Sequence, residues 1–222
     1  RIFVGLVLAA FTAAGAFAAP EFKLSAGAGG YFTSDFGGGA EVSYGGTTLF
    51  SRKTPYAGGG GFAFFDATYA ELSFGFFGGG GTSKTEELNL WNASKEESEA
   101  KTSTAGLDIG LLGKYPIEIS EKLSVFPLLG ITYRVVISEK WEKLKYGKPG
   151  DFSALWFNLG GGLDFSLTDQ LYLRGGLLYG LRTANKFEKD IKKGYDFLEA
   201  ALDTKSLLGH GLTVKLAVGY RL

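Results

Sequence analysis

Leu212-Thr-Val-Lys-Leu-Ala-Val-Gly-Tyr-Arg-Leu222 alternates strictly between apolar residues and polar or small ones. A period of two places successive side chains on opposite faces, so this stretch predicts a β-strand with unlike faces. The polar face carries Lys215 and Arg221, whereas the apolar face is unbroken. A β-barrel in lipid requires this arrangement, because its outside meets hydrocarbon while its interior can hold polar groups.

The same alternation recurs along the chain. Residues 123–133 show it clearly, whereas glycine and alanine blur it in the first two stretches. The pattern predicts an all-β fold, namely an eight-stranded antiparallel up-and-down transmembrane β-barrel. The expected strands are residues 22–33, 56–65, 69–79, 104–119, 123–136, 154–167, 171–182 and 209–222.

The connections between these strands alternate in length. Three are as short as hairpin turns, at residues 66–68, 120–122 and 168–170. Four are long and polar, at residues 34–55, 80–103, 137–153 and 183–208. Outer-membrane barrels have short periplasmic turns and long extracellular loops, so we expect both termini on the periplasmic side and four surface loops.

The alternation also assigns the two faces of the wall. Apolar side chains are expected outside, and this set includes Phe62, Phe64, Phe74, Leu107, Leu173 and Tyr179. Charges of both signs are expected inside, where burial demands that they be paired or hydrated. We expect these charges to pair across the lumen and, with inward Phe126, Trp156 and Tyr172, to plug it. The predicted lumen charge network is Lys23, Glu71, Asp108, Lys114, Glu118, Arg134, Asp164, Arg174, Arg182, Lys215 and Arg221.

The composition limits the chemistry. Glycine accounts for 35 of 222 residues, roughly twice its average use, and runs such as residues 58–61 fit tight packing in a small barrel. Lysine plus arginine equals aspartate plus glutamate at 23 each, which gives no indication of nucleic acid binding. The chain has no cysteine, which excludes disulfides, thiolate metal sites and cysteine nucleophiles. We expect no cofactor.

The first residues have the form of a targeting segment. Arg1 is followed by an apolar run through Phe11, and Ala16-Phe17-Ala18 fits an A-x-A cleavage site. The run is short for a membrane-spanning helix, which needs about 20 apolar residues. We therefore expect residues 1–18 to be a signal peptide and residues 19–222 to be the barrel domain, with a retained N-terminal anchor as the alternative.

Over residues 19–222 the chain resembles the small eight-stranded outer-membrane barrels of the protein A transmembrane-domain, protein X and protein W families. The resemblance is carried by the strand count, the loop asymmetry and the last strand, in which Val214, Leu216, Val218 and Tyr220 match. Family members usually end in an aromatic residue, but this chain ends in Leu222. The hairpins rich in glycine and aromatic residues are also similar to those of small spirochaete barrels.

The resemblance implies a place in the cell outer membrane, contact with outer-membrane lipid and recognition of the last strand by the barrel-assembly machinery. Protein W types are thought to pass small hydrophobic molecules, and protein X types act in adhesion.

Function is expected in the loops, because the wall is a scaffold. Residues 84–101 surround Trp91 with charges; we favour a solvated, mobile loop there over an adhesive one. Residues 187–202 have near-helical apolar spacing and predict a segment that lies either over the barrel mouth as a cap or on the membrane surface. Trp141 and Tyr146 are candidate interface anchors. The candidate surface-loop contacts are Trp91, Trp141, Tyr146, Phe187 and Tyr195.

Catalysis is not expected. The sole histidine is His210, and residue 212, where a nucleophile on the same face would stand, is Leu212. A histidine without a serine or a positioned carboxylate makes no triad, and the sequence offers no histidine pair or calcium loop for a metal.

The predicted function is a non-enzymatic surface scaffold whose loops contact the environment or a host. The alternative is a narrow, porin-like passive channel that transports small hydrophobic solutes. A third interpretation is a soluble periplasmic barrel or lipocalin-like binder with its apolar face inward.

Overall fold

The computed structural model describes residues 22–36, 38–89, 94–142, 148–183, 185, 186, 189, 202–207 and 209–222. Strands dominate this part of the chain, and no helix within it is long and apolar enough to cross a membrane. The elements are β1 (Leu24–Phe36), β2 (Gly39–Tyr44), β3 (Thr47–Lys53), β4 (Tyr56–Ala67), β5 (Ala70–Asn89), β6 (Ser94–Lys114), β7 (Ile117–Ser120), β8 (Leu123–Trp141), the 3-10 helix η1 (Pro149–Phe152), β9 (Ala154–Ser166), β10 (Leu171–Arg182), β11 (Leu202–Leu207) and β12 (Gly209–Arg221).

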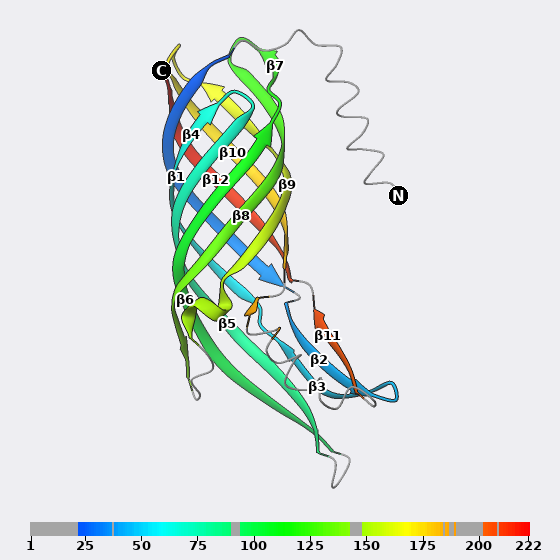
Figure 1. Cartoon of the computed structure of the whole chain (residues 1–222). Helices are drawn as coiled ribbons and strands as arrows, with labels where there is room; N and C mark the ends of the chain where they lie inside the picture. The colour runs from blue at the N-terminus through cyan, green and yellow to red at the C-terminus, as the bar shows by residue number, and fades with distance from the viewer. Residues whose placement is uncertain are drawn as a thin grey trace.

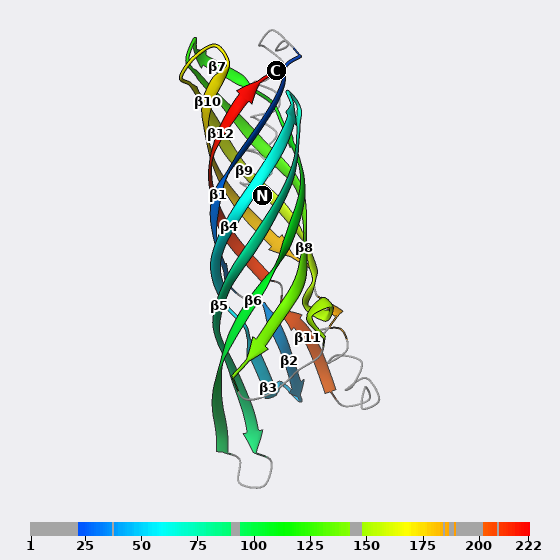
Figure 2. The same cartoon turned by 90° about the vertical axis from the view of Figure 1, so that its left-hand side faces the viewer.

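Eight of these strands close into a barrel (Figures 1 and 2). The antiparallel ring runs β1-β4-β5-β6-β8-β9-β10-β12, and β12 pairs back onto β1 with Ser25 opposite Arg221. Closure leaves the wall without a free edge, so the backbone groups of the ring are paired within it. The predicted eight-stranded up-and-down barrel is confirmed.

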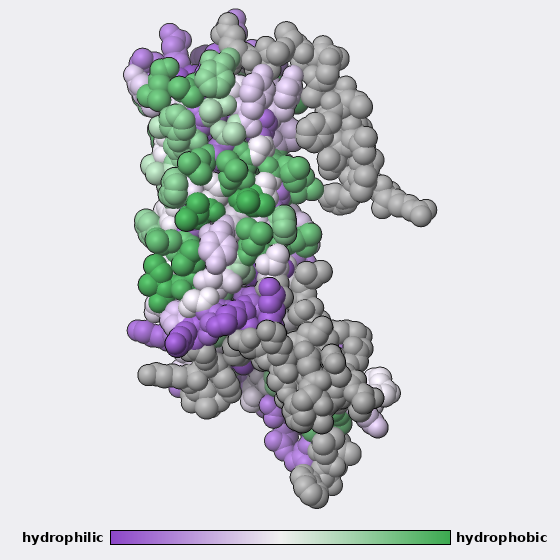
Figure 3. Space-filling view, in the orientation of Figure 1, coloured by the Kyte–Doolittle hydropathy of each residue, from purple (hydrophilic) through white to green (hydrophobic). Residues whose placement is uncertain are grey.

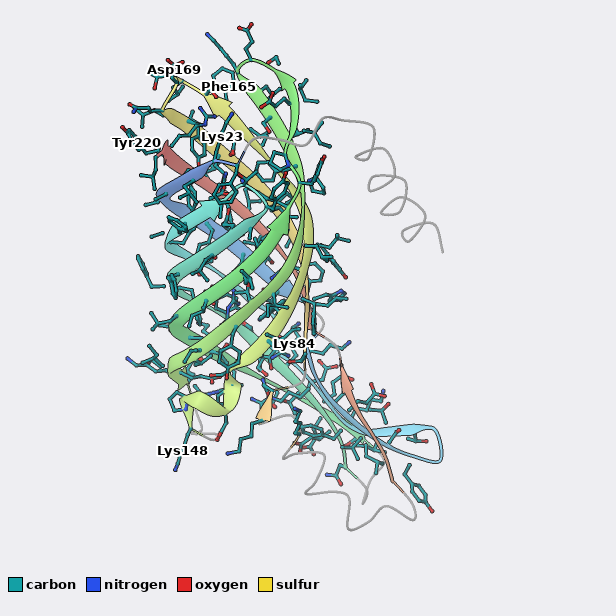
Figure 4. All side chains as sticks on the ribbon, turned by 45° about the horizontal axis from the view of Figure 1, so that its top comes forward. Lys23, Lys84, Lys148, Phe165, Asp169 and Tyr220 are labelled. Atoms are coloured by element: carbon teal, nitrogen blue, oxygen red, sulfur yellow. The ribbon has the colours of Figure 1, made fainter. Side chains whose placement is uncertain are left out.

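The two ends of the barrel differ. The short connections β4–β5, β7–β8 and β9–β10 lie at the end where β1 starts and β12 finishes (Figure 1), and we call this the turn end. Asp169, in the β9–β10 turn, and Tyr220 lie there in Figure 4, whereas Lys84 and Lys148 lie toward the opposite end, the loop end. The predicted separation of short and long connections is confirmed.

The outside of the barrel is apolar. Along β8, Leu129, Ile131 and Tyr133 are exposed, whereas Leu128, which precedes them, is buried. Figure 3 shows the result on one face, where apolar surface covers the wall between more polar regions at the two ends. A continuous belt of exposed apolar side chains is unfavourable in water and is what a hydrocarbon surrounding selects. The apolar-inside alternative is therefore wrong.

Two residues of β4 face opposite to the prediction. Phe62 and Phe64 were expected outside but are buried in the lumen, at 8% and 4% exposure. Phe64 lies against Gly27 of β1, where an added Cβ would overlap its ring. Directly opposed residues of an antiparallel pair share a face, so the pairing of Asp66 with Glu71 also fixes Phe64 inward.

The predicted loop 34–55 is a β-hairpin. Strands β2 and β3 are joined by Gly45 and Gly46, both with positive φ (56° and 83°), as a type I′ turn requires.

The predicted loop 80–103 is also largely strand. Strands β5 and β6 stay paired beyond the ring to Asn89 and Ser94, so this segment is a two-stranded ribbon and not the expected loop. Because β3 pairs with β5 and β11 pairs with β2, the order β11-β2-β3-β5-β6 forms what we call the loop-end sheet, seen below the barrel in Figure 1.

The predicted strand 104–119 is interrupted. Strand β6 ends at Lys114, and β7 starts at Ile117 and pairs only with β8 among the described strands. Pro116 stands in the gap, and proline has no backbone N–H to give to a ladder. The proposed signal peptide and the candidates Trp91, Tyr146, Phe187 and Tyr195 lie outside the described residues, so these assignments stay predictions.

Candidate functional site: the barrel lumen and its loop-end vestibule

Near the turn end, the lumen is crossed by a network that we call the Arg174 cluster: Arg174, Asp66, Glu71, Asp164, Lys114 and Lys215. Arg174 donates to both oxygens of Asp164 (2.8 and 2.7 Å), and it contacts Glu71 at 2.8 Å and Asp66 at 2.5 Å. Lys114 pairs with Asp66, and Lys215 lies 3.8 Å from Glu71. Three cations face three carboxylates, so the cluster is neutral as a whole.

Aromatic rings surround this cluster. The Arg174 guanidinium lies 4.7 Å from the ring centre of Phe64, 5.2 Å from Tyr172 and 5.3 Å from Phe126. These are cation–π distances, and the rings occupy the lumen between the charged side chains. Arg174 is 5% exposed and Asp66 is 2% exposed, so the lumen is filled at this level.

A second cluster, the Arg134 cluster, crosses the lumen nearer the loop end. Arg134 donates to Asp108 (3.1 Å) and to Asp35 (3.0 Å), and Tyr31 donates to Asp108 (2.6 Å). The Arg134 guanidinium also lies 4.7 Å from the ring centre of Phe77 and 5.3 Å from that of Trp156. A second set of ion pairs and rings therefore obstructs the lumen here.

Two hollows are separated by the Arg134 cluster. The inner one is a mid-lumen chamber, lined by polar groups that include Thr33, Ser73, Asn158 and Lys215. The outer one is a hollow of about 850 Å³ open to solvent at the loop end, which we call the vestibule. Arg134 and Trp156 line both hollows and so form the floor of the vestibule. The vestibule is lined by Tyr56, Phe77, Trp141, Phe152 and Trp156 and by Arg52, Glu139 and Arg182, among others.

The residues of the predicted charge network fall into the two clusters, with the remaining members at the two ends of the barrel. Five of its residues belong to the Arg174 cluster, and Asp108 and Arg134 belong to the Arg134 cluster. Arg182 lines the vestibule instead. Lys23, Glu118 and Arg221 line the turn-end mouth, where Arg221 donates to Ser166 (2.7 Å) and to the Asp169 carbonyl (3.0 Å) rather than to a carboxylate.

Two carboxylates central to these clusters were missed from the sequence. Asp66 was placed in a turn and Asp35 in a loop, but both lie within strands, in β4 and β1. A signal was available for Asp66: it shares the parity of Phe62 and Phe64, and a carboxylate in a strand marks the polar face.

Trp141 does not occupy the predicted position. It was expected as an interface anchor and surface contact, but it lines the vestibule, with Arg52 stacked 4.2 Å from its ring centre and Phe152 at 6.2 Å. Ala105 of β6 pairs with Ser138 of β8 and Gly106 pairs with Val136, so Ile137 is an extra residue on β8. Such a bulge re-aims the side chains that follow it, and Trp141 follows this one.

Outside the barrel wall, two loop-end groups have shifted pKa values. The pKa of Asp151 in η1 is lowered, because its carboxylate accepts from the Lys148 backbone N–H (3.1 Å) and from Lys186 (2.9 Å). In the loop-end sheet, the hydrogen bond to Glu99 raises the pKa of Lys84. No group of three or more potential metal ligands occurs within the described residues.

Solved structures with a similar chain path are outer-membrane proteins. One is outer membrane protein OprG from Pseudomonas aeruginosa, with 10% sequence identity and a TM-score of 0.47, where the match covers 92% of this chain and 97% of OprG. Another is outer membrane protease OmpT from Escherichia coli, with 9% identity and a TM-score of 0.48, where the match covers 91% of this chain and 99% of OmpT. Ail, the attachment invasion locus protein of Yersinia pestis, is a third, with 13% identity and a TM-score of 0.31, where the match covers 87% of this chain and 99% of Ail. Likenesses this distant carry no argument about activity. No curated protein sequence matches the chain significantly.

The family assignment comes from the sequence itself. The family model described as "Outer membrane protein beta-barrel domain" matches residues 3–221, almost the whole chain. The closed ring of eight strands, the apolar outside and the charged lumen are the features expected of such a protein. The chain belongs to the outer membrane protein beta-barrel domain family, and its place is the cell outer membrane.

Proposed function

We propose that this outer-membrane protein is a non-enzymatic surface scaffold: a barrel with a closed lumen that carries the loop-end sheet to contact the environment or a host. By the rule for outer-membrane barrels, the turn end faces the periplasm and the loop end faces outward. The proposal is supported by the lumen, the loop-end sheet and the surroundings of His210.

The Arg174 cluster is the observation that carries the proposal. An eight-stranded barrel is only wide enough for side chains or one small ligand, and here charged and aromatic side chains occupy that space. Opening this level would separate buried charges from their partners, which is strongly unfavourable. The Arg134 cluster adds a second obstruction in series.

The loop-end sheet supports a contact role. The β5–β6 ribbon extends beyond the ring, and its side chains at residues 94–99 are exposed. Strand pairing holds this charged surface in a fixed shape, which lowers the entropy lost on binding compared with a disordered loop.

The surroundings of His210 support a non-enzymatic role. Its Nδ1 lies 3.1 Å from the Tyr179 hydroxyl, and its ring centre lies 4.6 Å from that of Phe36. Neither neighbour is the carboxylate or the serine of a hydrolytic triad.

We also propose that β12 presents the outward-facing Val214, Leu216, Val218 and Tyr220 to the barrel-assembly machinery. All four side chains are exposed on the lipid side of the closed barrel.

Planar-bilayer recording tests the closed lumen. The folded full-length protein is inserted at known density and compared with an open porin in the same membrane. We expect the bilayer to stay silent while gel mobility before and after heating confirms folded protein. Reproducible single-channel steps from the unaltered chain would contradict the proposal.

One observation favours the second candidate, a narrow passive channel for small hydrophobic solutes. A groove on the lipid-facing wall is lined by Gly161, Gly162 and Gly175, and the inward-facing Phe126 and Lys215 also line it. The wall is thin there because glycine has no side chain. Uptake of an apolar dye into proteoliposomes tests this route. A channel predicts faster uptake than in empty vesicles. The substitution Gly176→Phe, which adds a side chain beside Lys215, should slow that uptake.

A further inference from the structure

Three buried polar atoms in the vestibule have no hydrogen-bond partner in the described structure. They are the Tyr56 hydroxyl, the Trp156 indole Nε1 and the Glu139 Oε2 atom. All three residues line the vestibule, although they come from three different strands, β4, β9 and β8. Buried polar atoms in native proteins are nearly always paired with protein, ordered water or a ligand, so this concentration calls for an explanation.

The surroundings of these atoms are aromatic. The Tyr56 ring meets the Phe77 ring edge-on, with ring centres 6.3 Å apart. The rings of Trp141 and Phe152 form a second pair, with centres 6.2 Å apart. A concave site with aromatic walls and a few convergent polar atoms is the usual form of a small-molecule pocket. Flat rings pack against such walls in offset or edge-on contacts.

The polar atoms restrict what the ligand carries. The Trp156 N–H is only a donor and needs an acceptor. The Glu139 carboxylate interacts with Trp141, but its Oε2 atom, which only accepts when the group is ionised, has no donor in the described structure. The Tyr56 hydroxyl can act in either role, as can Glu139 when protonated. A hydroxyl group on a ligand both donates and accepts, so it can serve either kind of partner.

The charges of the vestibule favour a neutral ligand. Glu139 and Asp35 face the same hollow as Arg52, Arg134 and Arg182. Arg134 is paired with Asp35 (3.0 Å), and Arg52 donates to Ser83 (3.2 Å) and stacks on Trp141, so these charges are already engaged within the protein. A charged ligand would lose its hydration without gaining an unpaired counter-charge.

We propose that the vestibule binds a small uncharged aromatic molecule carrying a hydroxyl group, that is, a ligand of the phenol class. The ligand rests on the floor made by Arg134 and Trp156, enters from the loop end and leaves by the same route. This binding role is additional to the proposed scaffold and does not depend on what the loop-end sheet contacts.

The test is a ¹⁹F NMR titration of the full chain in lipid nanodiscs with 4-fluorophenol, alongside 4-fluorotoluene, which has the same shape without the hydroxyl. Empty nanodiscs of the same lipid correct for partitioning. We expect saturable binding of 4-fluorophenol, and affinity for 4-fluorotoluene lower by about tenfold or more, the effect of losing a hydrogen bond.

Single substitutions assign the site. Trp156→Phe, Glu139→Gln and Tyr56→Phe each remove or alter one of the three atoms, and each is expected to weaken 4-fluorophenol binding by about threefold to tenfold. Tyr133→Phe is the matched control, since it removes a tyrosine hydroxyl from the lipid-facing side of β8. Gel mobility before and after heating verifies folding of every variant.

Two results would overturn the proposal. One is equal binding of the two fluorinated probes. The other is 4-fluorophenol binding that is absent, or unchanged in all three vestibule variants, which would mean that the vestibule holds water only. Bilayer conductance has no bearing on either result, so this proposal and the closed-lumen proposal can fail separately.

Discussion

Arg174 is the residue on which most of the lumen's electrostatics depend. It contacts Asp66, Glu71 and Asp164, and these carboxylates have few other cations within reach. Arg174→Ala leaves buried carboxylates with too little positive charge, so we expect a loss of about 3–5 kcal/mol in the free energy of unfolding. Urea unfolding in lipid vesicles measures it.

Lys84→Ala is the control for this substitution, because Lys84 pairs with Glu99 in full contact with solvent and its removal is expected to change little. A loss for Arg174→Ala no larger than that of the control would contradict the assigned role of the Arg174 cluster.

Position 219 needs a glycine because a neighbouring side chain occupies the space of a Cβ atom, not because of its backbone conformation. An added Cβ would overlap the ring of Tyr172, whose hydroxyl is hydrogen-bonded to Ser25 at 2.8 Å. We expect Gly219→Ala to destabilise the barrel by about 1–3 kcal/mol, measured by urea unfolding.

Two variants isolate the cause. In a Tyr172→Ala background, the added cost of Gly219→Ala should shrink, because the overlapping ring is gone. Gly176→Ala should have little effect, since the nearest atom to its added Cβ lies at 3.7 Å. An undiminished cost in the double variant would refute the steric explanation.

The sequence predicted the direction of single side chains where the alternation was clear. Leu173 and Tyr179 face outward and Arg174 faces inward, as period two requires. The prediction was wrong at Phe62 and Phe64, because hydrophobicity alone does not separate lipid from a lumen packed with rings. The nearby carboxylate of Asp66 is the better guide to the face.

At the scale of elements, η1 depends on one carboxylate. The Lys148 backbone N–H and Lys186 lower the pKa of Asp151, so the folded state favours its ionised form. The resulting stabilisation is present above the ordinary carboxyl pKa and is lost as pH falls through the lowered value. We therefore expect the Lys148 amide signal to shift on acidification below about pH 4, measured by NMR titration.

Asp151→Asn provides the control, because the amide does not titrate. A Lys148 shift that persists unchanged in that variant would show that another group is responsible.

The ring strands could be predicted from sequence, whereas the loop-end sheet could not. A wall between lipid and lumen imposes two unlike faces and hence period two. The β5–β6 ribbon beyond the ring is solvated on both faces, so Glu86 opposite Glu97 and Glu87 opposite Glu96 show no such alternation. The β2–β3 hairpin did carry a signal, Gly45-Gly46, because both positions need positive φ.

At the scale of the whole molecule, the fold follows from the two solvents on either side of the wall. The lipid-facing belt, ring closure and the placement of the three predicted short turns at one end were all predictable from the sequence. The vestibule was not, because it depends on how residues from β3, β4, β8, η1 and β9 meet in space. The periodicity of the sequence does not indicate which residues of different strands come together.

The central claim is that alternate residues of each ring strand face lipid, and β10 offers its most direct test. The chain has no cysteine, so single cysteines can carry a nitroxide without background. In lipid vesicles, the account predicts high oxygen accessibility by electron paramagnetic resonance at Leu173, Leu177 and Tyr179, and low accessibility at Gly176 and Leu178. Uniform accessibility along β10, or the opposite phase, would contradict it.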